Sequence, residues 1–262
     1  MFSKSFTLLF IATIIVTFVG YPHPAAGQYV TDGLLGYWSF DADTITGDTI
    51  TDVSGNNNDG LIVGTLNSVD GKFGEALEFG ELGAFVDTGL LVSPAEFDEL
   101  TMEAWVKPSK AHDAWGAVMA ADDGAWDRGF GHRGDIWEIQ IGKGWDPVAN
   151  KNLWQPGPLA DIGEWQHVVV TYAPNQISFY ENGERFDWGD GGFLETSVNP
   201  LLIGGDIACG PNCVFFGVID EVRVYSRALS EAEVRGNFEG TPTAVEPIQK
   251  LSLTWGAIKV SR

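Results

Sequence analysis

The amino-acid sequence predicts an all-β protein, a two-sheet antiparallel jelly-roll sandwich with one short helix near the C-terminus. Three observations support this prediction. The chain of 262 residues contains 33 Gly, 12% aromatic and 44% hydrophobic residues, a composition suited to a large core of strands and tight turns. Gly, Asp and Asn separate short runs of β-branched and aromatic residues. Only one segment carries a convincing helix start. Many short strands with regular turns are typical of sandwiches and jelly rolls.

Eight short runs have strand character. In chain order they are residues 34–40, 76–79, 84–87, 101–106, 165–172, 176–180, 200–203 and 214–225. Side chains alternate along a strand, so Met102, Ala104 and Val106 are expected on one face of the fourth run. Glu103 and Trp105 are expected on its other face.

Two local signals fix a hairpin and a helix. Asn182 and Gly183 lie between two strand-like runs and favour a type I′ turn. Ser230 is followed three residues later by Glu233, the pattern of a capping box, so a short helix is predicted to begin after Ser230.

Residues 1–27 have the pattern of a secretory signal peptide. Lys4 precedes an apolar run over residues 6–19, and Ala25 and Gly27 are small residues suited to cleavage before Gln28. The run is shorter than the ~20 residues that span a bilayer. We therefore expect an exported protein, secreted or at the cell surface, with no transmembrane segment after signal removal. Residues 28–239 are expected to form one domain, and residues 240–262 a linker and C-terminal tail.

The charge of the chain limits its partners. It carries 15 Lys and Arg against 36 Asp and Glu, for a formal net charge of −21. A field of this sign repels phosphate backbones and anionic membrane surfaces. We therefore expect no nucleic-acid partner.

The two cysteines, Cys209 and Cys213, enclose Gly-Pro-Asn, a sequence with turn chemistry. Two ligands are too few for a closed zinc site, and no His lies nearby in the sequence. In an exported chain a disulfide bond between them is the simpler prediction.

Seven motifs together point to a known family. They are residues 36–41 (Gly-Tyr-Trp-Ser-Phe-Asp), 52–56 (Asp-Val-Ser-Gly-Asn), 71–79 (Gly-Lys-Phe-Gly-Glu-Ala-Leu-Glu-Phe), 100–108 (Leu-Thr-Met-Glu-Ala-Trp-Val-Lys-Pro), 165–169 (Trp-Gln-His-Val-Val), the Asn182-Gly183 hairpin and 219–230 (Ile-Asp-Glu-Val-Arg-Val-Tyr-Ser-Arg-Ala-Leu-Ser). In this order the chain resembles the LamG-like (laminin G-like) jelly-roll family of the concanavalin A-like lectin/glucanase superfamily. The resemblance implies a non-catalytic binding module that recognises carbohydrate or an extracellular protein.

Candidate ligand-binding residues lie in the central segment, which resembles the family least. Residues 111–159 hold half of the ten Trp, and sugar rings stack on such aromatic faces. Trp126 and Trp145, flanked by Gly and Asp, are the expected exposed platforms. His132 and Arg133 are candidates beside them, and the Gly-rich context of residues 128–133 predicts an exposed loop around His132. The alternative is that these Trp residues fill the core of a large sandwich.

A structural calcium ion is a further expectation from the resemblance. LamG-like domains often carry one near the matching segments, which implies Asp41, Asp52, Asn56 and Asp220 as candidate ligands here. The alternative is that these Asp and Asn residues only form turns.

Two other functions remain open. The superfamily includes glucanases, whose paired carboxylates sit on one face of a strand. The chain lacks that motif: Asp135 and Glu138 are three residues apart, and Asp220 and Glu221 are adjacent, so each pair is predicted on opposite faces. We therefore expect no enzyme activity. A purely adhesive role is the second alternative, with the basic residues of the C-terminal tail docking a partner.

Overall fold

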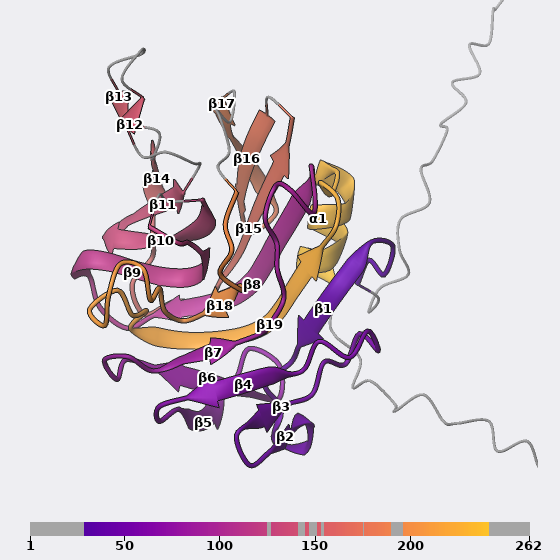
Figure 1. Cartoon of the computed structure of the whole chain (residues 1–262), viewed down its shortest axis with the longest axis vertical. Helices are drawn as coiled ribbons and strands as arrows, with labels where there is room; N and C mark the ends of the chain where they lie inside the picture. Colours follow the sequence, from indigo (N-terminus) through magenta and orange to yellow (C-terminus); the bar gives the residue numbers. More distant parts are fainter. Residues whose placement is uncertain are drawn as a thin grey trace, which may run out of the picture.

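The computed structural model describes residues 29–124, 127–140, 145–146, 151–152, 155–174, 176–189 and 196–240. The predicted signal peptide, the C-terminal tail and Trp126 lie outside these residues. Two antiparallel sheets pack face to face, and a short helix, α1 (Glu231–Glu239), lies at one side (Figure 1). The prediction of a two-sheet sandwich with one short helix near the C-terminus is confirmed.

The first sheet has eight strands. They are β1 (Leu34–Trp38), β5 (Asn67–Asp70), β6 (Glu75–Phe79), β8 (Leu100–Pro108), β15 (Gln166–Ala173), β16 (Gln176–Glu181), β17 (Glu184–Gly189) and β19 (Gly217–Tyr225). Their order is β17-β16-β15-β8-β19-β6-β5, and β1 pairs with β19 beside this path.

The second sheet has nine strands. They are β2 (Ile45–Thr46), β3 (Thr49–Ile50), β4 (Gly60–Val63), β7 (Phe85–Asp87), β9 (His112–Ala121), β10 (Arg128–Gly134), β11 (Ile136–Gln140), β14 (Gln155–Leu159) and β18 (Leu202–Ile203). Their order is β14-β11-β10-β9-β18-β7-β4-β3-β2. A small hairpin of β12 (Trp145–Asp146) and β13 (Lys151–Asn152) is separate, and η1 (Ala42–Thr44) is a single 3-10 turn.

The core lies between the two sheets. Met102, Ala104 and Val106 on β8 contribute to it, as the alternation predicts, and so does Trp137 on β11. These side chains are fully buried, so each removes its whole apolar area from water.

The outer face of the eight-stranded sheet is also buried, because α1 covers it. The Trp105 ring stacks on Phe238 of the helix, with ring centroids 5.7 Å apart. Near the start of the described chain, the Val30 amide donates to Asn237 Oδ1 at 2.9 Å. Glu103 is completely buried beneath the same helix. Both faces of β8 are therefore buried. The alternation of residues along the strand predicts only one buried face.

The predicted hairpin and helix start are confirmed. Asn182 and Gly183 both have positive φ, 51° and 78°, and they connect β16 to β17. The Ser230 side chain accepts from the Glu233 amide, and the Glu233 side chain accepts from the Ser230 amide, so the capping box is complete. Within the part of the chain that the structure describes, no helix is long and apolar enough to cross a membrane.

Three strands, β9, β10 and β11, occupy residues 112–140, where the sequence predicts none. Gly129 and Gly131 have no side chain, so the alternation of side chains that is typical of a strand cannot be recognised in the sequence of β10. A Cβ atom on Gly131 would lie 2.2 Å from the Gly116 carbonyl oxygen, and one on Gly129 would lie 2.5 Å from Gln140 Oε1. These glycines therefore permit close packing of strand neighbours rather than forming a loop.

Candidate functional site

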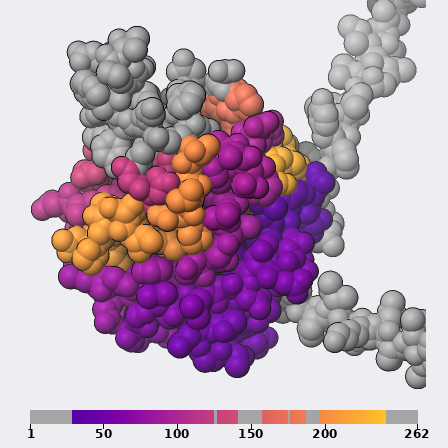
Figure 2. Space-filling view, in the orientation of Figure 1, coloured from indigo at the N-terminus to yellow at the C-terminus, as the bar shows by residue number. Residues whose placement is uncertain are grey.

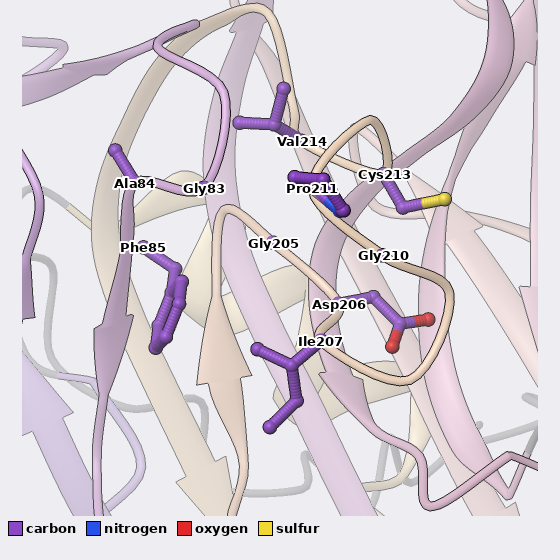
Figure 3. Close-up of a pocket in the computed structure, with 10 residues that line it drawn as sticks. All are labelled: Gly83, Ala84, Phe85, Gly205, Asp206, Ile207, Gly210, Pro211, Cys213 and Val214. Carbon is purple, nitrogen blue, oxygen red and sulfur yellow. The ribbon is translucent and has the colours of Figure 1, made fainter.

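An open pocket of about 210 Å³ lies on the outer side of the nine-stranded sheet. Two segments far apart in the chain form it: the start of β7 and the loop between β18 and β19. Its lining residues are Gly83, Ala84, Phe85, Gly205, Asp206, Ile207, Gly210, Pro211, Cys213 and Val214. Figure 3 shows Phe85 and Ile207 below Ala84, Pro211 and Val214, with the Asp206 carboxylate turned away from Phe85. In Figure 2 the loop after β18 is exposed as an orange patch at the left.

A disulfide bond and backbone hydrogen bonds hold the pocket loop. Gly205 and Val214 form an antiparallel bridge at its base, and Cys209 and Cys213 are joined, with Cα atoms 5.8 Å apart. The predicted disulfide is therefore confirmed. Asp206 Oδ1 accepts from the Ala208 and Cys209 amides at 3.0 and 3.2 Å, which fixes the turn. The loop is thus shaped before any ligand arrives.

Negative charge gathers beside the pocket. Burial and, to a smaller extent, the nearby Asp122 carboxylate raise the pKa of Asp206 to about 6, against the lowering effect of the amide donors. Gln140 Nε2 lies 3.4 Å from Asp206 Oδ2, while Gln140 Oε1 is buried without a hydrogen-bond partner. No Lys or Arg is among the lining residues. The pocket is therefore apolar inside and negative at its edge.

Two of the five central Trp side chains are described by the structure, and both are buried. Trp137 is in the core, where its Nε1 donates to Gln166 Oε1 at 3.2 Å, and Trp115 is buried on the outer face of β9. Packing in the sandwich core, the alternative weighed for the central Trp residues, is the outcome for Trp137, while Trp115 is buried in a separate cluster outside it. Trp145 begins β12, but its side chain lies outside the described residues, as do Trp126 and Trp154.

The expectation that His132 is exposed is wrong. His132 is on β10 and points inward with Phe130, because alternate residues share a face. Its ring meets those of Trp137 and Phe215 edge to face, with centroids 5.9 and 5.5 Å apart. Burial lowers the pKa of His132, which favours the neutral ring. His132 is completely buried and presents no surface to a ligand.

Arg133, the next residue, has its side chain 46% exposed and forms an ion pair with Glu138 at 3.2 Å. Burial raises the pKa of Glu138, and the Arg133 charge opposes that rise. Arg133 is therefore a surface residue of β10 held against β11, and it does not line the pocket.

Two of the four candidate calcium ligands, Asp52 and Asn56, are hydrogen-bonded within a turn. Asp52 Oδ1 accepts from the Tyr37 and Ser54 amides, both at 2.9 Å, and Oδ2 accepts from the Asn58 amide at 3.0 Å. Asn56 Nδ2 donates to the Leu34 carbonyl at 2.8 Å. Both side chains thus tie the segment after β3 to β1.

The other two candidates, Asp41 and Asp220, meet the turn between β5 and β6. Asp41 Oδ1 accepts from the Glu75 amide at 3.0 Å, and Asp220 Oδ2 accepts from the Lys72 and Phe73 amides at 2.8 and 3.0 Å. Asp220 Oδ1 is buried without a hydrogen-bond partner. Burial, then the Glu221 charge, and to a smaller extent Asp41, raise the pKa of Asp220 to about 8.

An orphaned carboxylate oxygen beside a second carboxylate suits a hard cation, whose remaining ligands are commonly carbonyls and water. Across the described ranges, no three His, Cys, Asp or Glu side chains are grouped so as to hold a metal ion. Asp41 and Asp220 therefore fit a calcium ion only as two members of a mixed ligand set.

Two of the carboxylates considered for hydrolysis, Asp220 and Glu221, are buried. Glu221 has a positive φ of 56° at the bulge in β19, and its Oε2 accepts from the Tyr37 hydroxyl and from Arg223. Asp220 and Glu221 are at most 2% exposed.

Sequence reasoning missed the pocket residues Phe85, Asp206 and Ile207. Phe85 falls on a predicted strand and Asp206 precedes the predicted disulfide, so each had a local signal. No signal in the sequence indicated that the two segments lie side by side, because about 120 positions separate them in the chain.

Comparisons with solved structures identify the fold. The binding domain of Paraclostridial Mosquitocidal Protein 1 is similar, with 17% identity and a TM-score of 0.61, over 79% of this chain and 52% of that one. A Trypanosoma rangeli sialidase in complex with sialic acid has 20% identity and a TM-score of 0.61, over 84% and 37%. Domain 4 of AbnA, a GH43 extracellular arabinanase from Geobacillus stearothermophilus, in complex with arabinotriose, has 21% identity and a TM-score of 0.56, over 77% and 96%.

This chain thus spans about half of the mosquitocidal structure and well under half of the sialidase. No curated protein matches it. A laminin G-type family model, described as the concanavalin A-like lectin/glucanases superfamily, matches residues 84–235, more than half of the chain. The chain belongs to the concanavalin A-like lectin/glucanases superfamily, as its motifs predict.

Proposed function

We propose that this protein is a secreted, non-catalytic carbohydrate-binding module. The observation that carries the proposal is the open pocket between β7 and the disulfide-closed loop. A sugar presents apolar C–H surfaces, which suit the Phe85 and Ile207 side chains, while its outward hydroxyls stay in water or meet backbone groups of the loop. The loop is held before binding, which limits the entropy lost on association.

The similarity to domain 4 of AbnA supports a glycan as the ligand. That domain was solved with arabinotriose, and the match covers 96% of it, so one domain is compared with another. The mosquitocidal structure is likewise described as a binding domain. Superfamily membership alone fixes no ligand.

Two features support a non-catalytic, exported protein. Glycoside hydrolysis needs two accessible carboxylates facing one bond, whereas Asp220 and Glu221 are buried, and Glu138 is paired with Arg133. The bond between Cys209 and Cys213 is of a kind that persists in oxidising compartments, which agrees with the signal-like residues 1–27.

The test is a glycan-array screen of residues 28–262, with calcium and then with a chelator. We expect neutral glycans to bind, and Ile207→Asp at the pocket edge to abolish binding. Leu159→Asp is the matched control, because Leu159 is also exposed but lies on β14, several strands away from β7. Loss of binding in Trp126→Ala or Trp145→Ala, but not in Ile207→Asp, would move the site to the central segment. A blank array on folded protein would favour protein–protein adhesion instead.

We also propose a structural calcium ion at Asp41 and Asp220, with backbone carbonyls and water completing its ligands. The ion would neutralise a buried carboxylate and fix the β5–β6 turn against β19. Asp220 Oδ1, which has no hydrogen-bond partner, is the atom that supports this site.

A further inference from the structure

We infer that the pocket between β7 and the loop after β18 receives a methyl group of a glycan, carried by a 6-deoxyhexose or by an N-acetylhexosamine. This inference rests on the proposed carbohydrate binding and names the sugar chemistry that the pocket selects.

The lining of the pocket is the first argument. Apolar atoms form nearly all of its surface, contributed by Phe85, Ile207, Pro211 and Val214 with the small residues around them. Asp206 is the only charged lining residue, and its carboxylate points into its own turn, where two amides hold Oδ1 (Figure 3). A sugar hydroxyl entering here would lose its water without gaining a partner, which is unfavourable. A methyl group forms no hydrogen bonds with water, so its transfer into the pocket is favourable.

The size of the pocket is the second argument. Its volume of about 210 Å³ is below the ~300–1,000 Å³ of pockets that enclose a whole small ligand. It is suited to a substituent together with the edge of one sugar ring, while the rest of the glycan stays outside. Ile207 is 50% exposed and forms the rim over which the glycan would pass.

The surrounding charge is the third argument. Asp206 places a carboxylate beside an otherwise apolar wall, in a chain with a net charge of −21. This field opposes carboxylated or sulfated sugars and leaves uncharged ones unaffected. The preferred methyl-bearing sugar is therefore neutral.

The experiment compares sugars that differ only at the methyl group: in the first two pairs the partner sugar carries a hydroxymethyl group at C6 in its place, and in the third pair the methyl group is absent. L-fucose is paired with L-galactose, L-rhamnose with L-mannose, and N-acetylglucosamine with N-formylglucosamine. Binding is measured by calorimetry and by saturation-transfer NMR on residues 28–262. In at least one pair the methyl-bearing sugar should bind about 10–100-fold more tightly, with the strongest saturation on its methyl protons. The first two pairs report a 6-deoxy ligand and the third an N-acetyl ligand.

Charge is tested with N-acetylneuraminic acid, which carries an N-acetyl methyl group and a carboxylate. Its neutral methyl ester should bind at least as tightly as the N-acetyl reference, and the free acid about tenfold more weakly at low salt. Ile207→Asp should weaken the methyl-bearing sugar at least tenfold, and Leu159→Asp should leave it unchanged. Circular dichroism melts of both variants check that each is folded.

Two kinds of failure are distinguishable. Equal affinity within every pair, with glycan binding otherwise retained, would overturn the methyl-group inference and leave carbohydrate binding intact. Absence of binding to any glycan by folded protein would overturn the proposed function and this inference with it.

Discussion

The Glu103 carboxylate and the Arg223 guanidinium form an ion pair at 2.9 Å beneath α1, and neither side chain is more than 1% exposed. Glu103 also accepts from Asn237 Nδ2 at 2.6 Å and lies 3.1 Å from His167 Nε2. These contacts lower the pKa of Glu103, chiefly through His167, against the opposing effect of burial, which is the largest influence. One carboxylate therefore connects β8, β15, β19 and the helix.

Glu103→Gln should destabilise the protein strongly, because the substitution leaves the buried Arg223 without one of its charge partners. We expect a loss of about 3–5 kcal/mol in the free energy of unfolding, measured by urea denaturation. Glu231→Gln is the control: Glu231 pairs with Arg235 at 3.6 Å on the exposed side of α1, where such pairs contribute about 0–1 kcal/mol. Similar losses in both variants would contradict a special role for the buried pair.

Glu233→Gln should destabilise the protein at neutral pH and lose this effect in acid. Hydrogen bonds from Arg227, followed by those from Ser230, lower the pKa of Glu233 from 4.5 to about 2. A lowered pKa contributes stability above the unfolded-state value, and this contribution is lost as the pH falls toward the folded-state value. Because the group is partly exposed, we expect about 1 kcal/mol at pH 7. The difference between the melting curves of the two proteins should shrink as the pH falls from 4.5 toward about 2; a constant difference over that range would argue against the ion pair.

Calcium should raise the melting temperature of the chelator-treated protein by about 5–10 °C, since ligand at ~100 times its dissociation constant adds about 2.7 kcal/mol. Asp220→Asn should remove this response, because it removes the charge of the orphaned carboxylate. Asp43→Asn, an exposed change near Asp41, should retain the response. An unchanged calcium response in Asp220→Asn would place the ion elsewhere, and no response in the wild type would count against calcium.

Replacing Cys209 and Cys213 by Ser should affect ligand binding more than stability. The bond closes a very short loop, for which chain entropy predicts only about 2 kcal/mol, or roughly 4–8 °C in melting temperature. The loss of glycan-binding free energy should exceed this loss of stability, because the loop supplies seven of the ten lining residues and would no longer be held in shape. Calorimetry with and without a reductant measures both quantities; full affinity in the reduced protein would show that the loop is ordered without its bond.

The sequence was informative where structure depends on neighbouring residues. Alternation predicted the buried face of β8, the Asn182-Gly183 pair predicted the hairpin, and Ser230 with Glu233 predicted the start of α1. Each of these signals lies within a few residues of the feature it controls.

The sequence was least informative where distant segments meet. The glycines of β10 suggested a loop because alternation is invisible without side chains, and His132 was therefore expected to be exposed. The pocket depends on the proximity of Phe85 and Ile207, which arises from the pairing of β7 with β18. Asp52 illustrates the same limit: the family resemblance that implies it as a calcium ligand gave no hint of the three amides that donate to its carboxylate.

The hydrogen bond from Val30 to Asn237 has a consequence for how this domain can be used in larger chains. It places the entry and exit points of the folded unit next to each other, at the α1 side, whereas the pocket loop projects at the opposite side in Figure 1. A unit with adjacent ends can be inserted into a loop of a host protein, or circularly permuted through a short linker, without stretching either partner. Such grafts would keep the pocket loop facing outward, so that the glycan binding proposed for it could be transferred to another chain.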